Sequence, residues 1–149
     1  MEVSDPIRSV LEFKGHDVFF VDPQTSVYEA IETMADRGIG ALLVMTGDKL
    51  VGLISERDYA RKIILKGRSS RETRVEEVMS SPVVCARPDD TVDNCMRIMT
   101  TNRIRHLPVA DNDRIVGILS IGDLVNWIIT AQAETIGHLH SYIAGSYPK

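Results

Sequence analysis

The chain contains the same residue pattern twice. When the sequence is compared with itself at a shift of 65 residues, residues 22–64 match residues 87–129 without a gap. The matched positions run through the whole unit: Pro23 and Pro88, Val27 and Val92, Met34 and Met99, Ile39 and Ile104, Leu42 and Leu107, Val44 and Val109, Gly52 and Gly117, Ser55 and Ser120, Asp58 and Asp123. One copy is too short to bury a good core, so the repeat predicts two copies packed about a pseudo-two-fold axis. A ligand site is expected where the copies meet.

Each copy reads as strand, helix, strand, strand, helix, because β-prone runs alternate with apolar residues at helical spacing. The elements expected in the first copy are a strand at 18–21, a helix from residue 27, a hairpin at 41–45 and 50–54, and a helix from residue 55. Those expected in the second copy are a strand at 83–86, a helix from residue 92, a hairpin at 107–110 and 115–119, and a helix from residue 120 to about residue 144. The prediction is an α+β fold with repeats at 7–66 and 80–132, a linker at 67–79 that holds one helical turn at 75–79, and a C-terminal helical extension at 133–149.

The composition fits one globular unit. At 149 residues and 44% hydrophobic content, the chain can bury roughly 70% of the surface of its unfolded form. Its apolar stretches have the length of strands and charged residues stand within the first 15 positions, so neither a membrane span nor a secretory signal is predicted. We expect a cytoplasmic protein with no membrane partner. Cys85 and Cys95 have no metal-like or redox-like spacing, and Cys95 lies on an apolar helix stripe, which predicts a buried, reduced thiol.

The apolar stripes of the helices that begin at Val27 and Val92 are typical of helices facing a core. The alternative is a homodimer through these outer helices, since a two-copy unit leaves apolar helix faces that can pair with a second molecule. The sequence leaves both interpretations open.

The net charge of −4 is unevenly distributed. Residues 57–74 carry a net charge of +5, which favours an anionic ligand or partner. Such a run is also typical of a solvated helix face. Aromatic residues make up 5% of the chain and few lie among these cations, so nucleic acid is not the favoured partner. An enzyme needs a nucleophile with a base, a catalytic pair of carboxylates or a metal cluster, and none of these has usable spacing. We therefore expect a non-catalytic protein without a metal.

The most informative local pattern is Gly-x-x-Ser-x-x-Asp, which ends in Ser55 and Asp58 in the first copy and in Ser120 and Asp123 in the second. A hydroxyl at the end of a strand and a carboxylate three residues later can together grip a sugar diol. The alternative is a capping box, in which the same side chains serve only the helix terminus. Arg57 favours the ligand interpretation, because a cation in the first turn of a helix is easier to explain when it faces an anion.

Four features of the sequence together resemble tandem cystathionine β-synthase (CBS) domains, known as the Bateman module. They are the order of elements, the doubled Gly-x-x-Ser-x-x-Asp, the Leu-Pro-Val at 107–109 and the Pro-Asp-Asp-Thr-Val at 88–92. The resemblance covers residues 7–135. Within the family the chain is similar to the stand-alone type found in bacteria and plant organelles.

The resemblance implies an adenosine-type ligand in each of two clefts between the copies. The implied ribose contacts are Ser55, Asp58, Ser120 and Asp123. The implied phosphate contacts are Arg57, Arg105, His106, Ser69, Ser70 and Thr73. The implied adenine contacts are Phe19, Phe20, Val83, Val84 and Pro108. Positive charge is expected near both clefts, from different elements, but Gly122 replaces Arg57 in the second copy, so two unequal sites or one functional site are expected.

The implied function is a non-catalytic sensor that takes AMP, ADP, ATP or NAD(H) as a regulatory ligand. Binding would favour one arrangement of the copies or of a dimer, and an unknown effector protein would read that change. The alternative is a dimeric scaffold that needs no ligand.

Overall fold

The computed structural model describes residues 4–143, with side chains up to residue 133. The first repeat contains β1 (Phe20–Val21), α2 (Val27–Arg37), β2 (Ala41–Thr46), β3 (Lys49–Ser55) and α3 (Glu56–Tyr59), which continues as a π-helical turn over Ala60–Ile64. The second repeat contains α5 (Val92–Asn102), β4 (His106–Asp111), β5 (Arg114–Ser120) and α6 (Ile121–Ile143). Two further helices, α1 (Ile7–Lys14) and α4 (Val75–Val78), precede the first strand segment of each repeat. The α+β fold with two repeats is confirmed, as is the helical turn after residue 74.

The helix boundaries follow local chemistry that both repeats share. Helix α2 begins after Ser26, whose side chain accepts a hydrogen bond from the Glu29 amide, and α5 begins after Thr91, which accepts from the Asn94 amide. Such caps satisfy backbone donors that a helix start leaves without partners. The apolar stripes of both helices are buried, including Cys95, so their interpretation as core surfaces is confirmed. Burial raises the pKa of the Cys95 thiol to about 12.

The two hairpins form separate sheets. In the first repeat β1 pairs parallel to β2, and β2 pairs antiparallel to β3. In the second repeat β4 pairs antiparallel to β5, and the strand expected at 83–86 is reduced to a bridge at Ala86. Ala86 donates to the Pro108 carbonyl at 2.9 Å and accepts from the Ala110 amide at 2.8 Å. The pairing stops there, and Val83 packs instead against the apolar cluster between the hairpins.

The helix that precedes each repeat completes the core of the other repeat. Ile7, Val10 and Leu11 of α1 lie in the core of the second repeat, and Val75 and Val78 of α4 lie in the core of the first. The backbone contacts are reciprocal. The Ile7 amide donates to the Asp90 carbonyl, and the Val75 amide donates to the Thr25 carbonyl, each at 2.8 Å. The expected ranges 7–66 and 80–132 therefore divide the chain by sequence order. The core of the second repeat nevertheless includes α1, which belongs to the first range.

Two equivalent glycines make room for this exchange. A Cβ at Gly117 would collide with the Leu11 side chain, and a Cβ at Gly52 would collide with the Met79 side chain. Each glycine lies on the last strand of its hairpin, so that strand can approach the helix that arrives from elsewhere in the chain. The match of Gly52 with Gly117 in the sequence thus has a steric cause.

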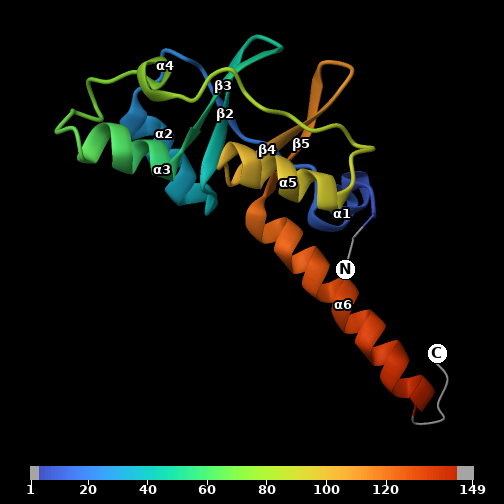
Figure 1. Ribbon diagram of the computed structural model, residues 1–149. Helices are drawn as coiled ribbons and strands as arrows, with labels where there is room; N and C mark the ends of the chain where they lie inside the picture. The colour runs from blue at the N-terminus through green and yellow to red at the C-terminus, as the bar shows by residue number, and fades with distance from the viewer. Residues whose placement is uncertain (1–3, 144–149) are drawn as a thin grey trace.

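The repeats meet through an apolar cluster formed by the hairpins. Ala41, Leu43 and Leu53 of the first repeat pack with Ile115 and Ile118 of the second. Figure 1 shows the hairpins side by side, with α2 and α5 alongside them and α6 projecting away from the body. Of the helices within residues 4–143, none is both long enough and apolar enough to cross a bilayer. Residues 144–149 of the expected C-terminal extension lie outside the described residues.

The exchange of helices predicts that shortening a buried side chain of α1 destabilises the protein. Leu11 is 1% exposed, so Leu11→Ala is expected to lower the free energy of unfolding by about 2–5 kcal/mol. Leu65 is 76% exposed, and the matched control Leu65→Ala is expected to change it by less than about 0.5 kcal/mol. Urea denaturation measures both. If both substitutions change the free energy of unfolding by the same small amount, α1 contributes little to the stability of the core.

Candidate nucleotide site between the repeats

The first Ser–Asp pair lies where β3 passes into α3, at a corner that we call the first corner (Ser55 and Asp58). The Ser55 amide and hydroxyl both donate to Asp58 Oδ2 at 3.0 Å, and the Asp58 amide donates to Ser55 Oγ at 3.2 Å. The capping box is therefore present. Asp58 Oδ1 faces away from this cap, toward Lys62 Nζ at 3.0 Å and Ser80 Oγ at 3.4 Å.

A cavity of about 610 Å³ opens beside the first corner. Its lining comes from both repeats: Gly40, Leu53, Ser55, Glu56, Arg57, Asp58, Arg61, Lys62 and Ser80 from the first repeat and the segment after it, and Asn102, Arg103, Ile104, Arg105 and His106 from the second repeat. The loop between α5 and β4 thus covers the Ser–Asp pair of the other repeat. A ligand in this cavity would contact both halves of the molecule.

The lining of the cavity carries more cations than carboxylates, since Glu56 and Asp58 are its acidic residues. Four arginines line it, namely Arg57, Arg61, Arg103 and Arg105. Within residues 4–133 none of the four forms an ion pair with a carboxylate. Arg57 Nη1 instead donates to the Arg103 carbonyl at 3.3 Å, which joins the repeats at the cavity rim. Arginines gathered in this way repel one another unless an anion lies among them.

Arg103 adopts an unfavourable backbone conformation to reach this position. Helix α2 ends at Gly38 with φ 65°, and α5 ends at the equivalent Arg103 with φ 53°. The left-handed region costs a residue with a Cβ roughly 1–2 kcal/mol, a cost that glycine avoids. The second repeat therefore has an arginine at the position where the first repeat has glycine, the residue that adopts this conformation without strain. Backbone strain of this kind is often retained at functional sites.

His106 packs at the back of the cavity against the start of β2. A Cβ on Gly40 would lie 3.2 Å from His106 Nε2, so the glycine leaves room for the imidazole. Burial lowers the pKa of His106, and the charge of Lys14 lowers it further. The imidazole is therefore neutral at pH 7 and offers a hydrogen bond rather than a charge.

The second Ser–Asp pair, the second corner (Ser120 and Asp123), has different surroundings. The Ser120 amide donates to Asp123 Oδ2 at 2.8 Å and the Asp123 amide donates to Ser120 Oγ at 3.1 Å, so the cap is repeated. Lys14 Nζ also lies 2.6 Å from Asp123 Oδ2. Burial alone would raise the pKa of Asp123, but the hydrogen bonds from Lys14 and Ser120 outweigh it and hold the pKa below its ordinary value. Asp123 lines a cavity of about 260 Å³ between α1 and α6.

Comparison with known proteins identifies the fold. The sequence profile of the CBS domain matches residues 10–65 and again residues 75–130. The chain belongs to the CBS-domain family. It is 37% identical over 153 residues to the mitochondrial CBS domain-containing protein CBSX3 of Arabidopsis thaliana, covering 97% of this chain and 74% of that protein. The prediction of tandem CBS domains is confirmed.

Solved CBS-domain structures agree with this assignment. A protein with CBS domains from Burkholderia ambifaria superposes with a TM-score of 0.82 at 45% identity, over 86% of this chain and 96% of that one. The CBS-domain protein ATU1752 of Agrobacterium tumefaciens gives a TM-score of 0.78 at 36% identity, over 82% and 98% of the two chains. Pairs of CBS domains are typical of regulatory modules that bind adenosine ligands.

The structure brings together some of the residues expected at the site and separates others. Of the residues implied as phosphate contacts, Arg57, Arg105 and His106 line the cavity at the first corner. Ser69, Ser70 and Thr73 lie instead beside the start of α2, where the carbonyls of Ser70 and Thr73 accept the amides of Tyr28 and Val27.

None of the five expected adenine contacts lines this cavity. Phe19 stacks under Arg37, Phe20 is 65% exposed, and Val84 is 36% exposed. Val83 faces a hollow beside the hairpin tips, and Pro108 is buried in β4.

Sequence reasoning missed Arg61 and Lys62 as cavity residues. Their spacing of four residues from Arg57 and Asp58 places them on the same helix face, which was an available signal. It also missed Lys14. Nothing near Lys14 in the sequence points to Asp123, because the two residues meet only through the exchange of α1.

The conformation of Arg103 predicts opposite effects at the two equivalent helix ends. Arg103→Gly is expected to raise the free energy of unfolding by about 1 kcal/mol, because glycine relieves the left-handed strain. The matched change Gly38→Arg is expected to lower it by about the same amount. Thermal and urea unfolding measure both. Destabilisation by Arg103→Gly would mean that the arginine side chain stabilises the fold rather than serving a ligand.

Proposed function

We propose that this protein is a non-catalytic regulatory module that binds an adenine nucleotide, namely AMP, ADP, ATP or NAD(H), in the cavity at the first corner. The observation that carries the proposal is the convergence of four arginines, none of which is ion-paired within the part of the chain that the structure describes, on a cavity that also holds Ser55 and Asp58. Family membership supports the adenosine part of the ligand.

The capping role of the first corner is compatible with binding a ribose. A carboxylate has about four acceptor positions, and the cap uses only Oδ2 of Asp58. Oδ1 is paired with Lys62 at 3.0 Å and accepts from Ser80 at 3.4 Å, and a ribose hydroxyl would take the place of the longer Ser80 contact. Ser55 Oγ can accept from the neighbouring hydroxyl. The cap then fixes the two side chains before the ligand arrives, which lowers the entropy cost of binding.

The phosphates would lie between the arginines of the two repeats. Arg57 and Arg61 come from the first repeat, and Arg103 and Arg105 come from the second. An anion held by both sets stabilises the arrangement in which they face each other, and this difference in affinity between arrangements is what a sensor requires. The strain at Arg103 is consistent with a residue retained for binding.

The adenine contacts proposed here differ from those that the resemblance implied. Leu53 and Ile104 are the large apolar side chains that line the cavity, one from each repeat. We place the base against these two residues. Neutral His106, held beside Gly40, is a hydrogen-bonding group for the ligand rather than a charge partner of the phosphates.

The alternative function is a dimeric scaffold that needs no ligand. Phe13 is 73% exposed and Ile129 is 58% exposed, which favours a contact near the base of α6. Light scattering measures the oligomeric state. A stable dimer that no nucleotide binds would support the scaffold, whereas nucleotide binding would support the sensor whatever the oligomeric state.

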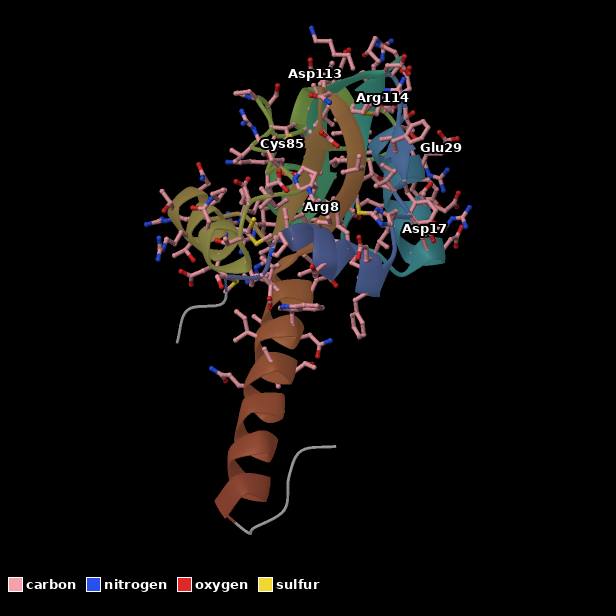
Figure 2. All side chains as sticks on the ribbon, turned by 90° about the vertical axis from the view of Figure 1, so that its right-hand side faces the viewer. Arg8, Asp17, Glu29, Cys85, Asp113 and Arg114 are labelled. Atoms are coloured by element: carbon pink, nitrogen blue, oxygen red, sulfur yellow. The ribbon has the colours of Figure 1, made fainter. Side chains whose placement is uncertain are left out.

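Nucleotide binding is expected to stabilise the protein. At a nucleotide concentration one hundred times Kd, the free energy of unfolding rises by about 2.7 kcal/mol, and for a chain of this size the melting temperature rises by about 5–10 °C. Asp58→Asn is expected to abolish the shift. The control is Asp113→Asn, at an exposed hairpin tip (Figure 2) and not part of the cavity lining. If AMP, ADP, ATP and NAD(H) all leave the wild-type melting temperature unchanged, the proposal is wrong.

The phosphate assignment has a separate test. Arg105→Ala removes a charged hydrogen bond worth about 1.5 kcal/mol or more, so the Kd for ADP is expected to rise about tenfold or more. Arg114→Ala is the matched control, because Arg114 is also an exposed arginine but lies at the hairpin tip (Figure 2). Isothermal titration calorimetry measures both. If the two variants bind ADP with equal affinity, Arg105 does not contact the phosphates.

A further inference from the structure

We propose that α6 pairs with α6 of a second copy of this chain, as a parallel two-stranded coiled coil whose seam begins at Val125 and ends at Ile143. The pairing is independent of the proposed nucleotide site. It places the contact between copies on α6 rather than on the outer helices α2 and α5, whose apolar stripes are buried in the cores of their own repeats.

Helix α6 carries apolar side chains on two faces. Leu124 is fully buried and packs with Trp127 and Ile128 in the core of the second repeat. Val125 and Ile129 each follow a residue of this buried face, so they lie about 100° further round the helix. They are 40% and 58% exposed. A surface helix needs one apolar stripe to join its core, so a second stripe indicates a second partner.

The outer half of α6 leaves the body of the molecule. Figures 1 and 2 show no other helix or strand of residues 4–143 beside it. The side chains of Thr130, Gln132 and Ala133 are exposed. The matched helical segment of the first repeat ends at Ile64, the counterpart of Ile129, so the projection belongs to the second repeat. Isolated helices shorter than about 12–15 residues are marginal in water, and we therefore expect a partner along this half.

The exposed stripe continues along α6 as a heptad pattern. Its positions follow one another at alternate spacings of four and three residues: Val125, Ile129, Gln132, Ile136, Leu139 and Ile143. At 100° per residue they fall in a band about 80° wide. That is the narrow seam of a coiled coil rather than the wider face of a helix that packs on a core.

The residue types along the seam fit a second copy of the same helix running in the same direction. The a positions of the heptads hold Ile129, Ile136 and Ile143, and the d positions hold Val125, Gln132 and Leu139. β-Branched residues at a with leucine at d favour two parallel strands. A parallel copy in register places Gln132 beside its own counterpart, and the two amides can exchange hydrogen bonds. An antiparallel copy would place Gln132 against an isoleucine and leave a buried amide without a partner.

The oligomeric state of the full chain tests the pairing, and light scattering measures it. The wild type is expected to be a dimer. Ile136→Glu combined with Leu139→Glu puts charges into the seam and is expected to raise the Kd of the dimer by about a hundredfold or more. The matched control is His138→Glu combined with Ser141→Glu, which adds two glutamates on the opposite side of the helix and should leave the dimer intact.

Hydrogen exchange of the β3 and β4 amides shows whether each variant keeps its folded body. A monomeric wild type would overturn the inference and leave the exposed stripe of α6 to a different protein. A dimer that survives both substitutions in the seam would also overturn it, because the copies would then meet on another surface.

The direction of pairing has a separate readout. Cys85 is exposed and Cys95 is buried, so the experiment starts from Cys85→Ser. Adding Gln132→Cys is expected to give a disulfide-linked dimer on oxidation, because a disulfide needs Cα atoms within about 7 Å and parallel pairing brings the two copies of residue 132 together. Thr130→Cys, on the other side of the helix, is the control and should stay uncrosslinked. A dimer in which Gln132→Cys forms no crosslink would overturn the parallel arrangement.

Discussion

The structure depends on the exchange of short helices between the repeats. Neither hairpin with its own following helices encloses a complete core. Leu11 fills the space that Gly117 leaves, and Met79 fills the space that Gly52 leaves. Because each repeat is completed by a segment that precedes the other, the two repeats are expected to fold together rather than independently. The same exchange fixes the distance between the corners and the loops that face them.

The exchange also explains how two copies of one pattern acquire unequal sites. The loop after α5 carries arginines and covers the first corner, whereas the equivalent loop after α2 carries Gly38 and Gly40. The helix that enters the second repeat ends in Lys14, and the one that enters the first repeat leads to Pro82. Small differences at matched positions thus give the two corners of a symmetric frame different charged surroundings. A regulatory module gains from this, since a single ligand that bridges the repeats can favour one arrangement of the whole molecule.

Much of the fold could be predicted from local pattern. The helices from Val27 and Val92, both hairpins, and the start of a helix after Ser55 and Ser120 follow from periodicity, turn residues and caps. Helix α1 was not predicted, because its eight residues have no counterpart within the matched ranges and its apolar face is explained only by the second repeat. The strand at 83–86 was predicted over too long a range, because side-chain propensity does not reveal that only Ala86 has a partner on β4.

The sequence by itself determined the duplication, the order of elements and the two Ser-x-x-Asp corners, because these depend on neighbours within a few residues along the chain. The tertiary structure alone decided which cations reach which corner. Arg105 and His106 lie beside Ser55 and Asp58, and Lys14 lies beside Asp123. These pairs are separated by tens of residues or more, and their meeting follows from how apolar faces pack across the two repeats, which no local pattern encodes.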